Sequence, residues 1–236
     1  MSGLRSGSRA QQWQQEQDAE FDLTSQRPIF HKVSYPPRIS LNGLLVGLLS
    51  TISLVVSGFV LVQVPSPLSW FGPAPQAMMP YSLQLPLGLF LATLLGPFMG
   101  PAVVILFLTV GLFFFPVFAN GGGLHYVFQP GFGYLLAIFL MAWPLSKRFH
   151  KAFQRPGQAS RSLKIIVQAL AAVFMVHLLG IAYLIVLTMT HQLSMHDLFG
   201  CVLRLSLEPL PYDFLATTLL LCLVRQVRLA LWLVLY

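Results

Sequence analysis

Charged side chains are scarce in this chain of 236 residues. Only 9% of the residues are Asp, Glu, Lys or Arg, and none of these four types occurs between Ile39 and Ser146. A water-soluble domain needs charged groups on its surface, so an uncharged run of this length excludes a soluble globular fold. With 56% hydrophobic residues and a mean hydropathy of +0.73, the composition predicts an integral membrane protein of the cell membrane.

Acidic residues number only seven against 14 basic ones, which gives a net charge of +7. The cations cluster between apolar runs, as in the cytoplasmic segments that flank membrane spans, so we expect no nucleic-acid partner. Outside the first forty residues the acids are limited to Asp197, Glu208 and Asp213.

Signals of enzymatic chemistry are also missing. The chain has no GxxxxGK[ST] phosphate loop, no HExxH pair and no GxSxG nucleophile elbow. Asp197 and Asp213 could form an aspartyl dyad, but neither lies in a recognisable catalytic motif. Cys201 and Cys222 are too few and too far apart for a metal motif. We therefore expect neither catalysis, nor a metal, nor a cofactor.

The hydrophobic runs predict an all-α membrane domain over residues 39–236, preceded by a polar tail over residues 1–38. The tail is rich in Gln, Ser and Arg, and we expect it to be disordered and cytoplasmic. The run from Leu83 to Phe118 is too long for one span, and Gly96-Pro97 and Gly100-Pro101 predict a break within it. The expected six transmembrane helices are 39–64, two within 83–118, 131–146, 162–190 and 210–224. The apolar C-terminal tail ALWLVLY is expected at the membrane interface.

The positions of the cations predict the orientation. Basic residues precede the first span and recur between the fourth and fifth spans, from Lys147 to Lys164. Two spans within 83–118 bring both clusters to the cytoplasmic side, as the positive-inside rule favours. Both termini are then cytoplasmic, and Arg204 is the one cation on the outer side. Three loops share that side: 65–81, 119–130 and 191–209.

Polar groups near these outer loops are the candidate ligand contacts. An ionisable side chain in or near a span is a functional candidate because it costs a few kcal/mol unless it is paired or hydrated. Asp213 is expected in the first turn of the sixth helix, where it either stabilises the helix N-terminus or binds a ligand, or does both. Asn120 follows an apolar run in a Gly-rich loop, where a turn role competes with ligand binding. Gln129 and Tyr134 could add hydrogen bonds, and His177 is expected in an interhelical hydrogen bond.

Two glycines in the first span are candidates for helix docking. Gly43 and Gly47 form a small-xxx-small pair, which lets another helix approach closely in lipid. This face could pack inside the bundle or dock on a separate membrane protein. The residues leave both alternatives open.

Five segments resemble, in order, the BioY family, the biotin-binding S component of energy-coupling-factor transporters. They are YSLQLPLGLFLATLLGPFMG, VGLFFFPVFANGGG, QPGFGYLLA, HLLGIAYL and LPYDFLA, from Tyr81 to Ala216. The chain departs from the family where a Gly-Pro-Thr-like sequence is usual and QPGF stands instead. It departs again at Ala216, where the family typically has a Lys three residues after its Asp. That Lys is the usual partner of the ligand's carboxylate, and Arg204 could replace it.

The resemblance implies a six-helix protein that captures biotin from the outer side. It implies docking, through faces such as Gly43 and Gly47, on a transmembrane coupling protein that carries two ATPase subunits. Asp213 and Asn120 would then contact the ureido ring of biotin. Partners would thus be biotin, membrane lipid and these transporter subunits.

Two other functions remain as alternatives. The chain could be an S component for another vitamin, consistent with Ala216 in place of the lysine. It could also be a scaffold protein of the membrane without transport activity, in which the Gly-rich loop is only a connector.

Overall fold

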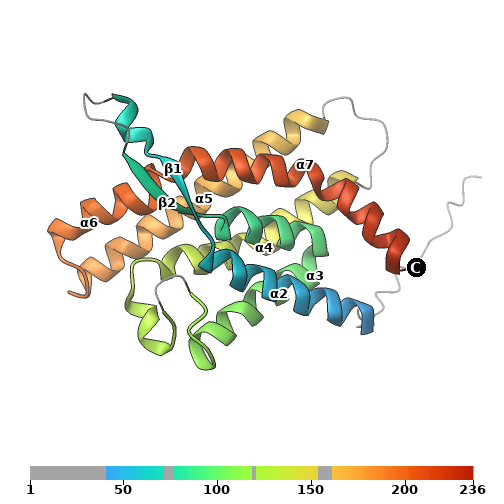
Figure 1. Ribbon diagram of the computed structural model, residues 1–236, viewed down its shortest axis with the longest axis horizontal. Helices are drawn as coiled ribbons and strands as arrows, with labels where there is room; N and C mark the ends of the chain where they lie inside the picture. The colour runs from blue at the N-terminus through green and yellow to red at the C-terminus, as the bar shows by residue number, and fades with distance from the viewer. Residues whose placement is uncertain (1–40, 72–76, 119–120, 154–160, 236) are drawn as a thin grey trace, which may run out of the picture. The chain divides into compact units, whose positions relative to one another are not determined.

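The computed structural model describes residues 41–71, 77–118, 121–153 and 161–235. The polar tail expected over residues 1–38 and its expected disorder lie outside these residues. The chain forms long helices joined by short elements (Figure 1). The elements in order are α2 (Leu41–Phe59), β1 (Leu61–Pro65), η1 (Pro67–Phe71), β2 (Met78–Ser82), α3 (Gln84–Phe113), η2 (Leu124–Phe128), α4 (Phe132–Phe153), α5 (Arg161–Met189), α6 (Met195–Val202), η3 (Leu203–Leu207) and α7 (Leu210–Leu235).

The structure is mostly helical, but it is not all-α as expected, because it contains one β-hairpin. The first helix was expected to reach Val64, but α2 ends at Phe59 and the next residues form β1. β1 pairs antiparallel with β2, from Leu61 opposite Ser82 to Pro65 opposite Met78. Val60, Val62 and Val64 are β-branched, and such side chains favour a strand once a partner is available. The outer loop expected over 65–81 is therefore partly a hairpin.

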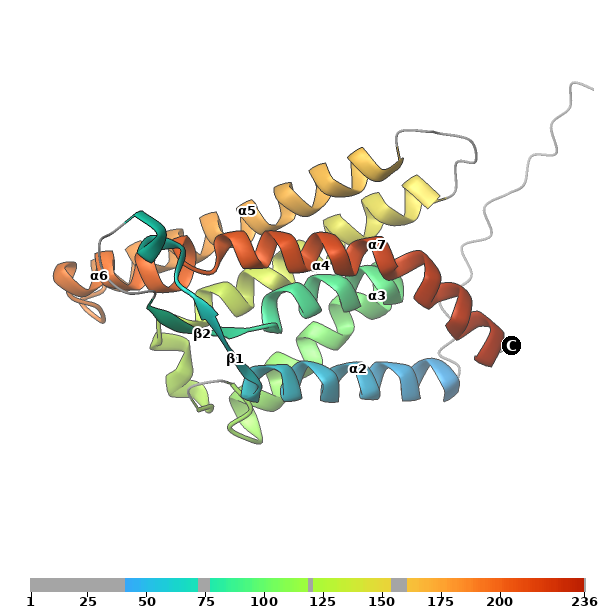
Figure 2. The same ribbon diagram turned by 45° about the horizontal axis from the view of Figure 1, so that its top comes forward.

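The predicted break in the long apolar run is confirmed at Gly96. There φ is 91° and ψ is 179°, although the helix is otherwise continuous from Gln84 to Phe113. Gly100 lies against the first arm of α3, because a Cβ at Gly100 would be 2.2 Å from the carbonyl oxygen of Ala92. The two arms of α3 thus pack closely beside the kink (Figure 2).

The remaining helices match the sequence to different degrees. α5 agrees with the prediction to within one residue at each end. α4 runs several residues past the expected end at Ser146 and includes Pro144. α7 runs past the expected end at Val224 and continues as a helix to Leu235, so it includes most of the tail ALWLVLY. The outer loop expected over 191–209 contains α6 and the π-helical turn η3 instead.

Four stretches of the described helices are long and apolar enough to cross a membrane. They are Leu41–Phe59, Gln84–Phe113, Leu163–Met189 and Met195–Arg228. Many large apolar side chains on α2 and α5 are exposed, for example Leu49 and Phe174, which is the pattern of a lipid-facing surface. The protein is thus an integral membrane protein built from helices.

The first arm of α3 forms the centre of the core. Leu89, Ala92 and Thr93 are fully buried there. α3 has its most extensive packing with α4, and it also contacts α2 and α7. The hairpin and α6 lie at one end of the helices, and the end of α4 and the start of α5 lie at the other (Figures 1 and 2).

Gly47 packs inside this bundle. A Cβ at Gly47 would lie 3.7 Å from Met99 and 3.8 Å from Val103, both on the second arm of α3. Ser50, Leu54 and Ser57 extend the same buried face of α2. Of the two alternatives for this face, the structure favours internal packing for Gly47, whose small size lets α2 approach α3.

Candidate functional site

Asp213 is the centre of the candidate site. It lies in the first turn of α7, as predicted, and it is only 3% exposed. Its Oδ1 accepts a hydrogen bond of 2.8 Å from the hydroxyl of Tyr81 on β2. Its Oδ2 lies 3.2 Å from Nε2 of His177 on α5. A buried carboxylate is costly without partners, and here a neighbouring strand and a neighbouring helix each supply one.

Tyr134 extends this cluster onto α4. Its hydroxyl shares a hydrogen bond of 2.6 Å with the hydroxyl of Ser206, and its ring meets the ring of His177 edge to face at 5.9 Å. A Cβ at position 180 would be 2.4 Å from the Tyr134 ring, so only glycine at this position leaves room for the ring. Asp213 and Tyr134 are the predicted residues that the structure brings into one cluster.

The hairpin covers the cluster through several contacts to the chain around the start of α7. Tyr212 donates a hydrogen bond of 2.6 Å to the carbonyl of Pro65, and Ser66 donates one of 3.0 Å to Glu208. The rings of Tyr81 and Tyr212 pack at 5.7 Å. These contacts hold β1 and β2 over Asp213, so the carboxylate is shielded from solvent.

The hydroxyl of Tyr81 remains a hydrogen-bond donor at neutral pH. Burial raises the pKa of Tyr81 well above its ordinary value, and the nearby Asp213 carboxylate raises it further. The phenol therefore stays protonated, as its hydrogen bond to Asp213 requires.

The other predicted residues make no hydrogen bond or ion pair with this cluster within the described chain, or they lie outside it. Gln129 is half-buried in the turn between η2 and α4, where its N–H donates to the carbonyl of Tyr126. Arg204 is exposed on η3. Asn120 lies outside the described residues. In the described residues around it, Gly121 and Gly123 adopt positive φ angles, as the Gly-rich sequence suggests.

Three residues of the cluster were not predicted as ligand contacts. Tyr81 and Ser206 carried no signal, because such residues are common and only the tertiary fold brings them to Asp213. His177 was expected in an interhelical hydrogen bond, and the structure places it on α5 beside Asp213 of α7, with Nε2 at 3.2 Å from the carboxylate. A search for buried polar residues within apolar runs would have ranked His177 beside Asp213.

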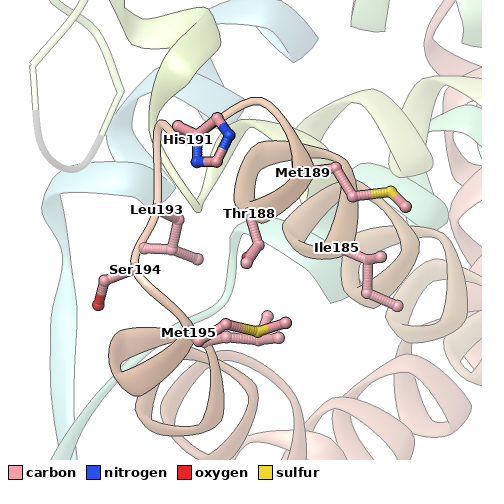
Figure 3. A pocket seen from close by; sticks show the side chains of 8 residues that line it. Ile185, Thr188, Met189, His191, Leu193, Ser194 and Met195 are labelled. Atoms are coloured by element: carbon pink, nitrogen blue, oxygen red, sulfur yellow. The ribbon is translucent and has the colours of Figure 1, made fainter.

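A separate cleft of about 480 Å³ lies between the C-terminal end of α5 and the start of α6 (Figure 3). Ile185, Met189, Leu193 and Met195 make its lining mainly apolar, and His191 lies at its edge. None of the cluster residues around Asp213 contributes to this cleft. Within the described part of the chain, no group of three His, Cys, Asp or Glu side chains could hold a metal ion.

Comparison with known proteins places this arrangement in a family context. The family model described as "BioY family" matches residues 36–232. A protein of Lysinibacillus sphaericus named "Probable biotin transporter BioY" is 34% identical over 93 residues, which cover 39% of this chain and 46% of that protein. The aligned segment thus spans about half the length of this relative.

A solved structure has the same fold. It is the S-component for biotin from an ECF-type ABC transporter, and it superposes with a TM-score of 0.59 at 21% sequence identity. The match covers 83% of this chain and 95% of that one.

Proposed function

This chain belongs to the BioY family, and from that premise we propose that it is the substrate-capture (S) component of a biotin transporter of the energy-coupling-factor type. The buried Asp213 is the observation that carries the proposal. Its carboxylate faces a hydroxyl and an imidazole, both of which can rearrange when a ligand with N–H donors enters. The two N–H groups of the biotin ureido ring are donors of this kind.

We propose that apolar side chains of α4 and α5 hold the rest of the ligand. Leu135, Ile138 and Val176 are buried on α4 and α5, the helices that carry Tyr134 and His177. Apolar walls with a few polar groups are typical of small-molecule sites, in which the polar groups fix the orientation. Tyr134 and Ser206 are the polar groups that we propose for the ureido carbonyl. Asn120, Gln129 and Arg204 remain proposed contacts from the outer loops.

We propose six membrane crossings with both termini in the cytoplasm of a plasma-membrane protein. The kink at Gly96 supports counting α3 as two crossings beside α2, α4, α5 and α7. Lys147 and Arg148 lie near the end of α4 that is remote from the hairpin. The positive-inside rule then assigns the Asp213 end to the outer side. Biotin would enter from that side, beneath the hairpin.

The proposed partners are a transmembrane coupling protein and its ATPase subunits. The chain has no phosphate loop of its own, so energy from ATP would have to come from other subunits. Gly43 and Gly47 on α2 remain the proposed docking residues. The exposed apolar face of α2, with Leu44 and Leu48, would contact either the coupling protein or membrane lipid.

Calorimetric titration of biotin into the purified protein in detergent tests the proposal. We expect saturable binding by the wild type and its loss in Asp213→Asn, because the neutral amide is a weaker acceptor and places an N–H beside the donor hydroxyl of Tyr81. Asp197→Asn, which changes an exposed acid on α6, is the matched control and should bind normally.

The outcomes separate the substrate from the site. Normal binding by Asp213→Asn would keep biotin as the substrate and overturn the site. No binding by the folded wild type would overturn biotin, and riboflavin or thiamine would then be titrated as other vitamin substrates. Loss of binding in Asn120→Ala alone would move the site to the Gly-rich loop.

A further inference from the structure

The cleft between α5 and α6 has an apolar interior that the proposed function does not use. Leu193 and Leu198 form its inner side, because both are half-buried and pack against the core. Ile185, Met189 and Met195 line its open side and are 46%, 76% and 77% exposed (Figure 3). Its volume of about 480 Å³ is typical of cavities that hold small molecules.

The polar side chains of the cleft are mostly engaged within the protein. The hydroxyl of Thr188 donates a hydrogen bond of 3.0 Å to the carbonyl of Leu184. The hydroxyl of Ser194 donates one of 2.6 Å to the carboxylate of Asp197. His191 lies at the edge, in a turn where its φ is 58°. The interior therefore offers little to a polar solute, whereas an apolar chain gains dispersion contacts along its walls.

The cleft lies where two apolar stretches meet. Leu163–Met189 and Met195–Arg228 are long and apolar enough to cross a membrane, and Met189 and Met195 both line the cleft. Between these stretches, residues 190–192 are polar and exposed, as at a membrane boundary. Exposed apolar side chains at helical spacing form a stripe on α5 that leads to the cleft, namely Val167, Phe174, Leu178, Ile185 and Met189. The cleft thus continues the lipid-facing surface of α5.

We propose that this cleft binds one acyl chain of a phospholipid from the surrounding membrane. The part of the chain next to the glycerol lies in the cleft, the rest follows the stripe on α5, and the headgroup lies beside residues 190–192. Met195 of α6 and Ile185 of α5 contact the same chain, so the lipid joins the two helices. None of the eight residues of α6 is buried, so such a contact adds substantially to its packing.

Native mass spectrometry of the full chain tests the proposal. The protein is delipidated in dodecyl maltoside and titrated with palmitoyl-oleoyl phosphatidylcholine. We expect one molecule to bind at least about tenfold more tightly than any further ones. Thr188→Phe places a ring in the cleft and should remove this tight binding. Val186→Phe is the matched control, because Val186 is 51% exposed on α5 and does not line the cleft.

Photolabelling of the wild type tests the position of the chain. The probe is a phosphatidylcholine with a diazirine on the acyl chain close to the glycerol. After the loosely held lipid has been washed away with detergent, irradiation should label Met189 and Met195. It should leave Phe174 unlabelled, which is 58% exposed on the same stripe but does not line the cleft.

Several outcomes would overturn the proposal. Absence of a tight first lipid, or its undiminished binding by folded Thr188→Phe, would remove the site. Equal labelling of Phe174 and the cleft residues would show only the lipid that surrounds any membrane protein. Displacement of the probe by biotin would assign the cleft to the vitamin instead. The labelling uses the wild type, so it is decisive even where Thr188→Phe does not fold.

Discussion

The two ends of α7 each carry one ionisable side chain in a buried or half-buried position, and the two are partnered in opposite ways. Asp213, near the start, contacts two side chains from other elements, Tyr81 and His177. Arg228, near the end, donates to two backbone carbonyls, those of Leu94 and Thr93, at 2.8 Å and 2.7 Å. Side chains can change rotamer when a ligand arrives, whereas backbone carbonyls in a packed helix cannot.

The difference supports the proposal that Asp213 binds a ligand, whereas Arg228 has a structural role. Arg228 satisfies carbonyls of the first arm of α3 just before the kink at Gly96, where the helix leaves them without their usual donors. It is a cap supplied from another helix. Among the described residues, the partners of the Asp213 carboxylate are side chains, Tyr81 and His177, and not backbone groups of a neighbouring element. This contrast supports assigning ligand binding to the Asp213 end.

The largest expected effect is on binding at the Asp213 end. Asp213→Asn should weaken biotin binding by at least about 100-fold, or roughly 3 kcal/mol, because a charged acceptor is lost from a buried site. Thermal stability in detergent should hold or rise, since a buried carboxylate no longer has to be desolvated. A large loss of stability would mean that Asp213 is structural, and the contrast between the two ends would fail.

The next effect is on stability at the other end. Arg228→Met keeps much of the length of the side chain but removes two charge-assisted hydrogen bonds, and should cost about 2–3 kcal/mol of unfolding free energy. Biotin affinity should stay within about twofold of the wild type, because the change is remote from Asp213. Arg148→Met, at an exposed arginine near the end of α4, is the control for loss of charge. Unchanged melting of Arg228→Met would contradict the capping role.

A smaller effect is expected at the kink that Arg228 supports. Gly96→Ala should destabilise the protein by about 1–2 kcal/mol, because the backbone there is accessible almost only to glycine. Gly200→Ala is the matched control, since a Cβ at that position on α6 would meet nothing within 4 Å. Differential scanning fluorimetry of the two variants compares them directly. Equal melting would show that the kink relaxes without cost.

The smallest effect concerns the pH dependence of the Asp213 end. The pKa of Tyr81 is raised in the folded protein, so its contribution to stability is complete below pH about 10 and is lost as the pH rises beyond it. Tyr81→Phe should cost about 1 kcal/mol at neutral pH through the lost hydrogen bond. It should also flatten the fall in melting temperature above pH 10. If the melting temperature of Tyr81→Phe fell above pH 10 as steeply as that of the wild type, groups other than Tyr81 would cause the fall.

The sequence predicted much of the helical framework because long apolar runs and glycine-proline breaks are local signals. The extent of α5 and the break at Gly96 follow directly from them. The β1–β2 hairpin was missed because its pairing joins residues that are far apart in the sequence, from Pro65 with Met78 to Leu61 with Ser82, and because Val60–Val64 reads equally well as the end of a helix. α6 was missed because it is short and follows a polar stretch.

The candidate site was predicted in part for a related reason. Asp213 was found because a carboxylate inside an apolar run is rare and costly. Tyr81 and Ser206 are ordinary residues whose value depends on where the hairpin and η3 place them, which no local pattern records. Gly47 illustrates the same limit, because a small residue on a helix face does not reveal whether the partner helix belongs to the same chain.

The kink at Gly96 also has a consequence for how the chain enters the bilayer during synthesis. From Gln84 to Leu95 the first arm of α3 extends about 18 Å at 1.5 Å per residue, well short of the roughly 30 Å hydrocarbon core. It can be this short because it is almost wholly surrounded by protein. Its partners α4 and α7 follow it in the chain, so before they arrive the arm has no stable place in lipid by itself. If α3 makes the two crossings proposed above, its first arm would be inserted as a hairpin with the second arm and be enclosed only when α7 is complete.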